Sequence, residues 1–241
     1  MGKSLIQQRH GKGTSQFRAH SFRWKTEISY RNYDNAEKTG VIKGKVLDLI
    51  DCPGHTAPIA LIKYENGDEA CIPAPLNMKV NDEVSAGSQS PLLPGCILPL
   101  KNIPEGTAIY NIESIPGGGG AFCRTAGCAA KILSTIQGKI LVELPSKKVK
   151  SFSPECRATI GVISGSGRLE KPWLKAGKKH HAMRALGKYY PNTSGVAMNA
   201  VNHPFGSGRG RHVGKPKTIP RFAPPGRKVG KLRARKTGRG K

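Results

Sequence analysis

Apolar and polar positions alternate in short runs along residues 41–112, and turn-forming residues separate the runs. A period of two places one face of a strand in a core, and β-branched residues favour the same conformation. The pattern predicts short strands over 41–50, 57–64, 69–73, 96–98 and 108–112. Short strands without a convincing helix between them favour a small closed barrel.

The turns between these runs have their own signals. Asn66 and Gly67 form the strongest one, because both residue types tolerate a positive φ and so suit a hairpin turn. Pro53 and Gly54 predict a turn after the first run, and Asn81 with Asp82 starts another.

A second β-rich stretch follows, with strand patterns over 128–136, 139–145, 149–152 and 158–163. Gln137 and Gly138 form the turn between the first two of these strands. Short strands closed by tight turns predict a second small barrel, and the pattern suits an SH3-like barrel as well as other meanders.

The remaining segments carry fewer signals. Residues 116–120 (PGGGG) fit either a flexible linker or a loop whose backbone lies against a phosphate, and no Gly-Lys-Ser/Thr follows to make a P-loop. A short helix is predicted around 176–186, and Gly187 would end it. Frequent prolines after that point argue against further regular structure.

Charge divides the chain. The 241 residues carry 40 Lys and Arg against 15 Asp and Glu, a net charge of +25, but residues 41–167 hold twelve basic and eleven acidic residues. Residues 1–40 hold eight basic and three acidic residues, and 168–241 hold twenty basic residues and one acid. This division predicts a basic N-terminal arm (1–40), two barrels (41–115 and 116–167) and a basic C-terminal extension (168–241).

So much like charge in a compact state repels itself, which argues against an ordinary soluble enzyme. The arms also lack enough large apolar residues to offset an ordering cost of roughly 1–2 kcal/mol per residue. They are therefore either solvated tails or segments that become ordered on a polyanion. We favour the polyanion, because the charge is so one-sided.

The six cysteines are too sparse for a disulfide scaffold and predict reduced thiols. A zinc site built from Cys123 and Cys128, with Cys52 and His55, is the alternative. No apolar run is long enough to span a membrane, and the N-terminus has no secretory apolar region, so we expect a cytoplasmic protein without membrane contact.

Two β barrels with basic arms fit nucleic-acid binding. No helix-turn-helix, zinc finger or basic zipper is visible, and flexible Gly/Arg tails suit a folded RNA better than a uniform duplex. A DNA-compacting protein is the competing hypothesis. Motifs of hydrolases, metalloproteases and dinucleotide enzymes do not occur.

Several motifs carry a family resemblance. Residues 124–127 (RTAG), 156–161 (CRATIG) and 195–206 (GVAMNAVNHPFG) closely resemble the universal family of large-subunit ribosomal protein L2. Residues 171–177 (KPWLKAG) and 223–230 (APPGRKVG) look like its archaeal and eukaryotic branch, and the short chain favours the archaeal type. The resemblance extends over essentially the whole chain.

The resemblance implies a mainly β fold: an oligonucleotide-binding (OB) barrel, then an SH3-like barrel, with long extended basic arms at both ends. It implies a structural constituent of the large ribosomal subunit that binds large-subunit rRNA and supports subunit association, tRNA binding and the peptidyl-transferase centre. The implied partners are that rRNA, small-subunit rRNA at the subunit interface, other ribosomal proteins and, indirectly, tRNA. No cofactor is implied beyond Mg²⁺ ions that bridge to rRNA phosphates.

The resemblance and the charge pattern together select the expected rRNA-binding residues. Two arginines fall in barrel segments that resemble RNA-contacting parts of the family, two lysines lie on the first barrel, and the others lie in the C-terminal extension. They are Arg124, Arg157, Lys45, Lys63, Lys178, Lys179, His180, His203, Arg209, Arg211, Lys215, Arg227, Lys228, Arg233 and Arg235.

His203 matches the family's much-discussed histidine, for which direct catalysis of peptide transfer is contested. We therefore expect no enzyme, with a general-base role of His203 as the alternative. Two departures bear on this loop. Asn202 replaces a usually acidic residue that could orient the imidazole. Ser207 replaces a glycine, which is tolerable only if φ stays negative there.

Overall fold

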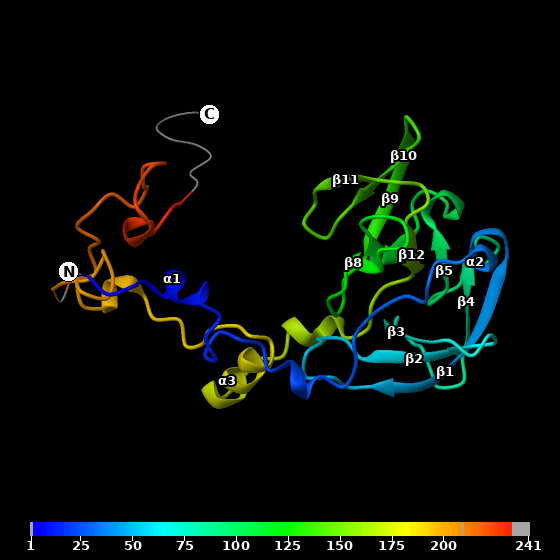
Figure 1. Ribbon diagram of the computed structural model, residues 1–241, viewed down its shortest axis with the longest axis horizontal. Coiled ribbons are helices and arrows are strands. Elements are labelled where there is room, and N and C mark those ends of the chain that lie inside the picture. Colours follow the sequence, from blue (N-terminus) through cyan, green and yellow to red (C-terminus); the bar gives the residue numbers. More distant parts are fainter. Residues whose placement is uncertain (1, 209, 233–241) are drawn as a thin grey trace. The chain divides into compact units, whose positions relative to one another are not determined.

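The computed structural model describes residues 2–208 and 210–232, which fall into two compact units. One, the sheet unit, comprises residues 21–174. The other, the arm unit, is formed by the two chain ends, 1–20 and 175–241. In Figure 1 the labels α1 and α3 mark the arm unit, and the labelled strands and α2 mark the sheet unit.

The sheet unit is built almost entirely of strands. Their bounds are β1 (Val41–Ile50), β2 (Ile59–Tyr64), β3 (Glu69–Pro73), β4 (Glu83–Gly87), β5 (Ile97–Pro99), β6 (Ala108–Tyr110), β7 (Ile112–Glu113), β8 (Gly120–Phe122), β9 (Ala130–Ile136), β10 (Lys139–Glu143), β11 (Val149–Phe152) and β12 (Arg157–Ile160). Ten strands form one sheet in the order β11-β10-β9-β6-β12-β5-β4-β1-β2-β3, and β7 pairs with β8. The predicted mainly β fold is confirmed.

Helices are few and short. They are α1 (Ile6–His10), α2 (Asn35–Thr39) and α3 (Ala176–Ala185), with 3-10 turns at Ser21–Arg23, Leu100–Asn102, Ser166–Leu169, Gly195–Ala197 and Pro225–Arg227. The helix predicted around 176–186 is confirmed as α3, whereas the alternation pattern gave no signal for α1 or α2. Among the described residues, no helix has the length and apolar character needed to cross a membrane.

Two hydrophobic cores lie along the sheet, and β5 supplies both. Ile97 packs into the core that contains Val46, Ile62 and Ile72. Its neighbour Leu98 packs into the other core, which is built mainly from β6, β9, β10 and β12. Successive side chains of a strand point to opposite faces, so one short strand can form a wall of both cores.

The two predicted hairpin turns differ in geometry. Gln137 and Gly138 both have positive φ, 50° and 70°, as a two-residue turn between β9 and β10 requires. At the other turn Gly67 has a φ of 88°, while the Asn66 side chain accepts a hydrogen bond from the Asp68 amide at 3.2 Å. Asn66 therefore stabilises this turn through its side chain rather than through a left-handed backbone.

A buried ion network joins the segment before β1 to the far half of the sheet. Arg157 lies between two carboxylates, 2.8 Å from Glu113 and 3.0 Å from Glu37. Arg31 lies 2.8 Å from the same Glu37. All four side chains are at most 2% exposed, so two buried positive charges are balanced by two buried negative ones.

The glycine-rich loop is held by the same network. The amides of Gly117 and Gly119 donate hydrogen bonds to the Glu113 carboxylate at 3.2 and 3.1 Å. From Gly120 the chain then continues as β8, beside β7. These two loop amides therefore bind a protein carboxylate, so the loop is not the flexible linker that was one expectation. The other expectation was a loop that binds phosphate, and here the Glu113 carboxylate occupies the place of the anion.

We expect Glu113→Gln to destabilise the sheet unit by about 3–5 kcal/mol, because it leaves the buried Arg157 charge undercompensated. Urea unfolding followed by tryptophan fluorescence measures this, since Trp24 and Trp173 both belong to the sheet unit. The control is Glu155→Gln. Its partner Lys101 lies 2.7 Å away at the surface, and we expect a loss of at most about 1 kcal/mol. Equal losses in both variants would contradict the prediction.

Candidate nucleic-acid interface

The arm unit contains no acidic residue. Residues 1–20 and 175–241 carry 22 Lys and Arg and not one Asp or Glu. All 15 acidic residues lie in the sheet unit, with the other 18 basic ones. A compact body of like charges without internal counter-charge repels itself, so this unit requires an external polyanion.

Apolar burial gives the arm unit little compensation. Its buried hydrophobic residues, within the described part of the chain, are Leu5, Ala185, Ala223 and Val229. The two chain ends are joined by backbone contacts, for example from the Lys3 amide to the Val201 carbonyl at 2.8 Å. The burial of four mostly small side chains stabilises the unit only weakly.

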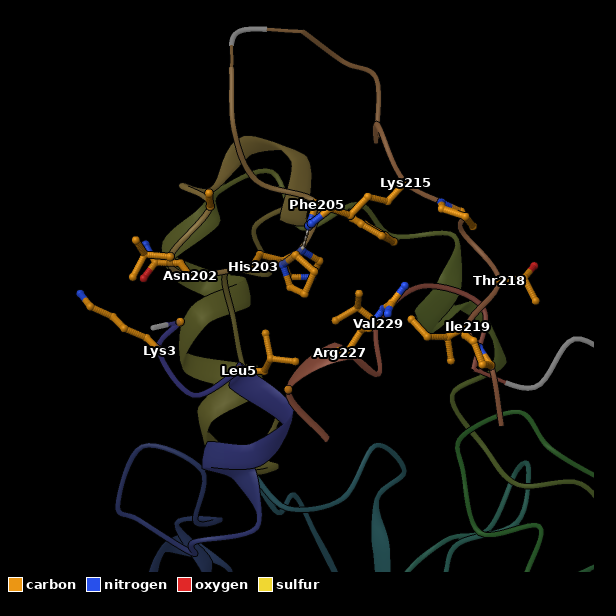
Figure 2. A pocket seen from close by; sticks show the side chains of 17 residues that line it. Lys3, Leu5, Asn202, His203, Phe205, Lys215, Thr218, Ile219, Arg227 and Val229 are labelled. Atoms are coloured by element: carbon orange, nitrogen blue, oxygen red, sulfur yellow. Dashed lines mark hydrogen bonds between the residues drawn. The ribbon is translucent and has the colours of Figure 1, made fainter. Parts of the chain in front are cut away.

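A cavity of about 630 Å³ lies between the two chain ends of this unit. Leu5, Phe205 and Val229 give it an apolar side, and Lys3, Lys215 and Arg227 are the cations among its lining residues, which include no acid. Figure 2 shows His203 and Phe205 between Lys215 and Leu5. Cationic groups around an apolar surface suit a ligand with phosphate and an aromatic or sugar part.

The ring of His203 is fixed by its own loop. Its Nδ1 accepts a hydrogen bond from the Phe205 amide at 3.0 Å, and the two rings lie 5.2 Å apart. At Gly195 the Cβ of any side chain would collide with the imidazole. Since Nδ1 accepts, the neutral ring carries its hydrogen on Nε2, and its one lone pair can take up a proton only when the hydrogen bond from Phe205 breaks.

The backbone of this loop departs from one expectation. Ser207 has a φ of 128°, which lies in a backbone region that residues other than glycine rarely adopt. The condition that φ stays negative at this residue is therefore not met. Asn202, the second departure, is exposed.

Helix α3 presents several of the predicted residues. Lys178 and His180 are exposed and Lys179 is half-buried, while the one buried residue of the helix is Ala185. A ten-residue helix with no acid in its first turn, no side-chain cap and no apolar face is marginal in water. It is suited to lie against a polyanion.

Four further predicted residues of the extension are exposed, as a phosphate contact requires: Arg211, Lys215, Arg227 and Lys228. Three others, Arg209, Arg233 and Arg235, lie outside the described residues.

The two predicted lysines of the sheet unit lie directly opposite each other. Lys45 on β1 faces Lys63 on β2. Their neighbours in the same row are Glu83 on β4 and Glu69 on β3, and all four residues are exposed. This row is electrically neutral, in contrast to the arm unit.

Arg124 is half-buried and bridges two segments. Its guanidinium donates to the carbonyls of Gly120 at 3.0 Å and Ile28 at 3.4 Å. Desolvation by burial lowers the pKa of this group. Arg124 thus connects the glycine-rich loop to the segment before β1.

The position of Arg157 corrects the expectation that its side chain is available to phosphate. The residue is 1% exposed, and its guanidinium binds Glu113 and Glu37 and packs on the rings of Tyr30 and Tyr33. We leave Arg157 out of the interface proposed below. The sequence could not show this, because its partner carboxylates lie 44 and 120 residues away.

The alternative of a zinc site at Cys123 and Cys128 has no support among the described residues. No group of three or more His, Cys, Asp or Glu side chains there is arranged to hold a metal ion. All six cysteines are free thiols. Cys52, Cys71, Cys96 and Cys156 are buried, and Cys123 and Cys128 are half-buried.

Some cationic residues of the arm unit were missed by the sequence analysis. Lys3 lines the cavity of His203, and Arg184 and Lys188 line a smaller one. The sequence does hold a signal for them, because residues 1–20 contain no Asp or Glu. Counting charges over 1–40 hid this, since all three acidic residues of that range lie after residue 20.

A chain that combines an acid-free cationic unit with a self-sufficient β sheet has the character of a nucleic-acid-binding protein. Comparison with known families identifies it further. The model described as "Ribosomal Proteins L2, RNA binding N-terminal domain" matches residues 2–86, and "Ribosomal Proteins L2, C-terminal domain" matches residues 93–221. The chain belongs to the ribosomal protein L2 family.

Archaeal relatives match along the whole length. The chain is 52% identical over 239 residues to large ribosomal subunit protein uL2 of Methanothermobacter thermautotrophicus, covering 99% of each chain. The corresponding protein of Methanopyrus kandleri is 50% identical over 240 residues, covering 100% of this chain and 99% of that one. That of Methanococcus vannielii is 47% identical over 239 residues, covering 99% and 100%.

Protonation of His203 should loosen its loop. Burial lowers the pKa of His203 from its ordinary 6.5, so the unfolded chain takes up the proton first. The loop is then most stable above pH 6.5 and loses stability as the pH falls through 6.5 toward the lower folded value. An NMR titration of the imidazole, assigned by its loss in His203→Asn, should give a midpoint below 6.5. A midpoint at or above 6.5 would contradict this.

Ser207→Gly should stabilise the same loop by about 1 kcal/mol. Relief of a backbone strain of about 1–3 kcal/mol exceeds the roughly 0.5–1 kcal/mol that glycine costs in entropy. Hydrogen exchange of the Gly206 amide, which donates to the His203 carbonyl at 2.9 Å, should slow. Ser194→Gly is the control, because Ser194 has a φ of −64° and should gain nothing. Faster exchange in Ser207→Gly would refute the strain.

Proposed function

We propose that the protein is a structural constituent of the large ribosomal subunit in the cytoplasm and binds large-subunit rRNA through its arm unit. The observation that carries this is the arm unit's 22 Lys and Arg without an acid. Family membership supports it, because the relatives are named large ribosomal subunit proteins and the N-terminal domain model is described as RNA binding.

The mechanism is electrostatic and entropic. Lys and Arg displace condensed counterions from the phosphates, so binding weakens steeply as salt is added. Exposed arginines such as Arg211 and Arg227 can fork onto phosphate oxygens, and Lys215 acts as a point charge. Since the unit buries few apolar groups of its own, the rRNA supplies much of the free energy that orders it.

The sheet unit would serve as the anchor from which the arms reach the RNA. For the domains of the chain we propose an N-terminal arm (1–40), two barrels (41–115 and 116–167) and a C-terminal extension (168–241). Lys45, Lys63 and Arg124 are secondary candidates for rRNA contact on the sheet unit. The neutral row around the two lysines makes the arm unit the principal interface.

The finer partners follow from the family resemblance. They are small-subunit rRNA at the subunit interface, other ribosomal proteins and, indirectly, tRNA. The corresponding roles are subunit association, tRNA binding and support of the peptidyl-transferase centre. Mg²⁺ ions that bridge rRNA phosphates would complement the cations of the chain.

We propose a non-catalytic role for His203. A general base needs an available lone pair, and in this loop Nδ1 already accepts the Phe205 amide hydrogen. Asn202 offers no carboxylate to orient the ring or to stabilise an imidazolium. His203 instead shapes the wall of the cavity beside Lys215 and Arg227.

Replacing Lys215 and Arg227 by Gln together should weaken binding of the full-length protein to large-subunit rRNA. The slope of log Kobs against log salt should become less steep by about 0.9 for each lost phosphate contact. The matched control, Lys45→Gln with Lys63→Gln, removes the same charge from the sheet unit and should change the slope little.

Two outcomes would count against the proposal. An equal change of slope in both double variants would place the interface on the sheet as much as on the arms. Equal affinity for large-subunit rRNA and for duplex DNA at one salt concentration would favour a DNA-compacting protein instead.

A further inference from the structure

A second cavity of the arm unit, of about 330 Å³, lies at the C-terminal end of α3. It is lined by Ser15, Gln16, His180, Arg184, Gly187, Lys188, Tyr189 and Tyr190. None of these residues lines the 630 Å³ cavity, whereas Gly187, Lys188 and Tyr189 also line a third cavity, of about 470 Å³, whose lining includes His203. The set contains three basic side chains, two phenol rings and no acid.

The end of α3 builds this cavity. His180 and Arg184 lie one helical turn apart and so share a face of the helix. The Lys188 amide donates to the Met183 carbonyl at 2.8 Å, and the Gly187 amide donates to that of Arg184 at 3.1 Å. This double hydrogen bond is a Schellman motif, which ends the helix and reverses the chain.

Gly187 is required at this reversal for two reasons. Its φ is 66°, and a Cβ there would lie 3.0 Å from the Ala19 nitrogen. The close approach brings the N-terminal segment against the end of the helix. The residues after Gly187 can then form one side of the cavity.

Both aromatic rings contact other side chains of the arm unit. Tyr189 packs 5.6 Å from Phe17 and 6.2 Å from His10. Tyr190 has the Lys179 ammonium 5.2 Å from its ring centre and stays partly exposed. A partly exposed ring gives a base a surface to stack on.

The cations are placed to take a phosphate. The Nε of Arg184 lies 3.2 Å from the His20 ring, which orients the guanidinium, and its two terminal amino groups carry four further donors. Lys188 is exposed at the same cavity. An oriented guanidinium beside an ammonium matches a phosphodiester group.

We propose that this cavity binds a single unpaired nucleotide of RNA, with its base on Tyr190 and its phosphate at Arg184 and Lys188. The inference rests on the proposed function, because rRNA would supply the nucleotide. A regular duplex keeps its bases stacked inside and offers no ring for Tyr190. The volume lies at the low end of ligand cavities, roughly 300–1,000 Å³, and so suits one small unit rather than a peptide segment.

The test uses the full-length protein and a fluorescent ten-residue oligouridine, with an RNA duplex of equal length as the second probe. Tyr190→Leu should bind the single strand about tenfold more weakly, because it removes a stacking ring. Tyr190→Phe keeps the ring and should bind as the unchanged protein does. Neither variant should alter duplex binding or the salt slope.

The charge at the cavity is tested separately. Arg184→Gln with Lys188→Gln should make the single-strand salt slope less steep by about 0.7 for each lost contact. The matched control is Lys79→Gln with Lys139→Gln, which removes the same charge from exposed positions of the sheet unit and should leave this slope unchanged.

Three results would overturn the assignment. If Tyr190→Leu and Tyr190→Phe bound the single strand equally well, the ring of Tyr190 would not stack on a base. An equal loss on single strand and duplex would show general damage to the arm unit. Competition by an acidic decapeptide as strong as that by oligouridine would indicate a protein partner. If any of these occurs while Lys215→Gln with Arg227→Gln still weakens rRNA binding, the cavity assignment fails and the proposed function stands.

Discussion

The missing counter-charge of the arm unit is the constraint on which the rest depends. A body with 22 cations and no anion cannot balance its own field, whatever its backbone does. Its few apolar contacts and short uncapped helix would not hold it together alone. The positions of the cations around two acid-free cavities become favourable once phosphates surround them. The fold of this unit is in that sense shared with its ligand.

The sheet unit solves the opposite problem within itself. Its arginines find carboxylates, and Arg157 and Arg31 share Glu37 in a buried network that also holds the glycine-rich loop. The same residue type thus has two uses in one chain. Where acids are present, arginine joins distant strands, and where they are absent, arginines such as Arg211 and Arg227 are exposed at the surface that we propose for RNA.

Most strands were predictable because their signal is local, but β4 and β8 were not among those predicted. Alternation placed β1 and β3 at their observed bounds, and Gly187 marked the end of α3. Long-range pairing was not predictable. No local pattern relates Arg157 to Glu37 across 120 residues. The strained φ of Ser207 and the meeting of the two chain ends also depend on tertiary contacts.

The shared strand β5 has a consequence for how such a chain can be divided. The matched domains end at residue 86 and resume at residue 93, yet Ile97, beyond that boundary, fills the first core. A fragment cut between them would lack one wall of its interior and expose Val46 and Ile62 to water. The chain therefore cannot be divided at this boundary without opening one of its cores.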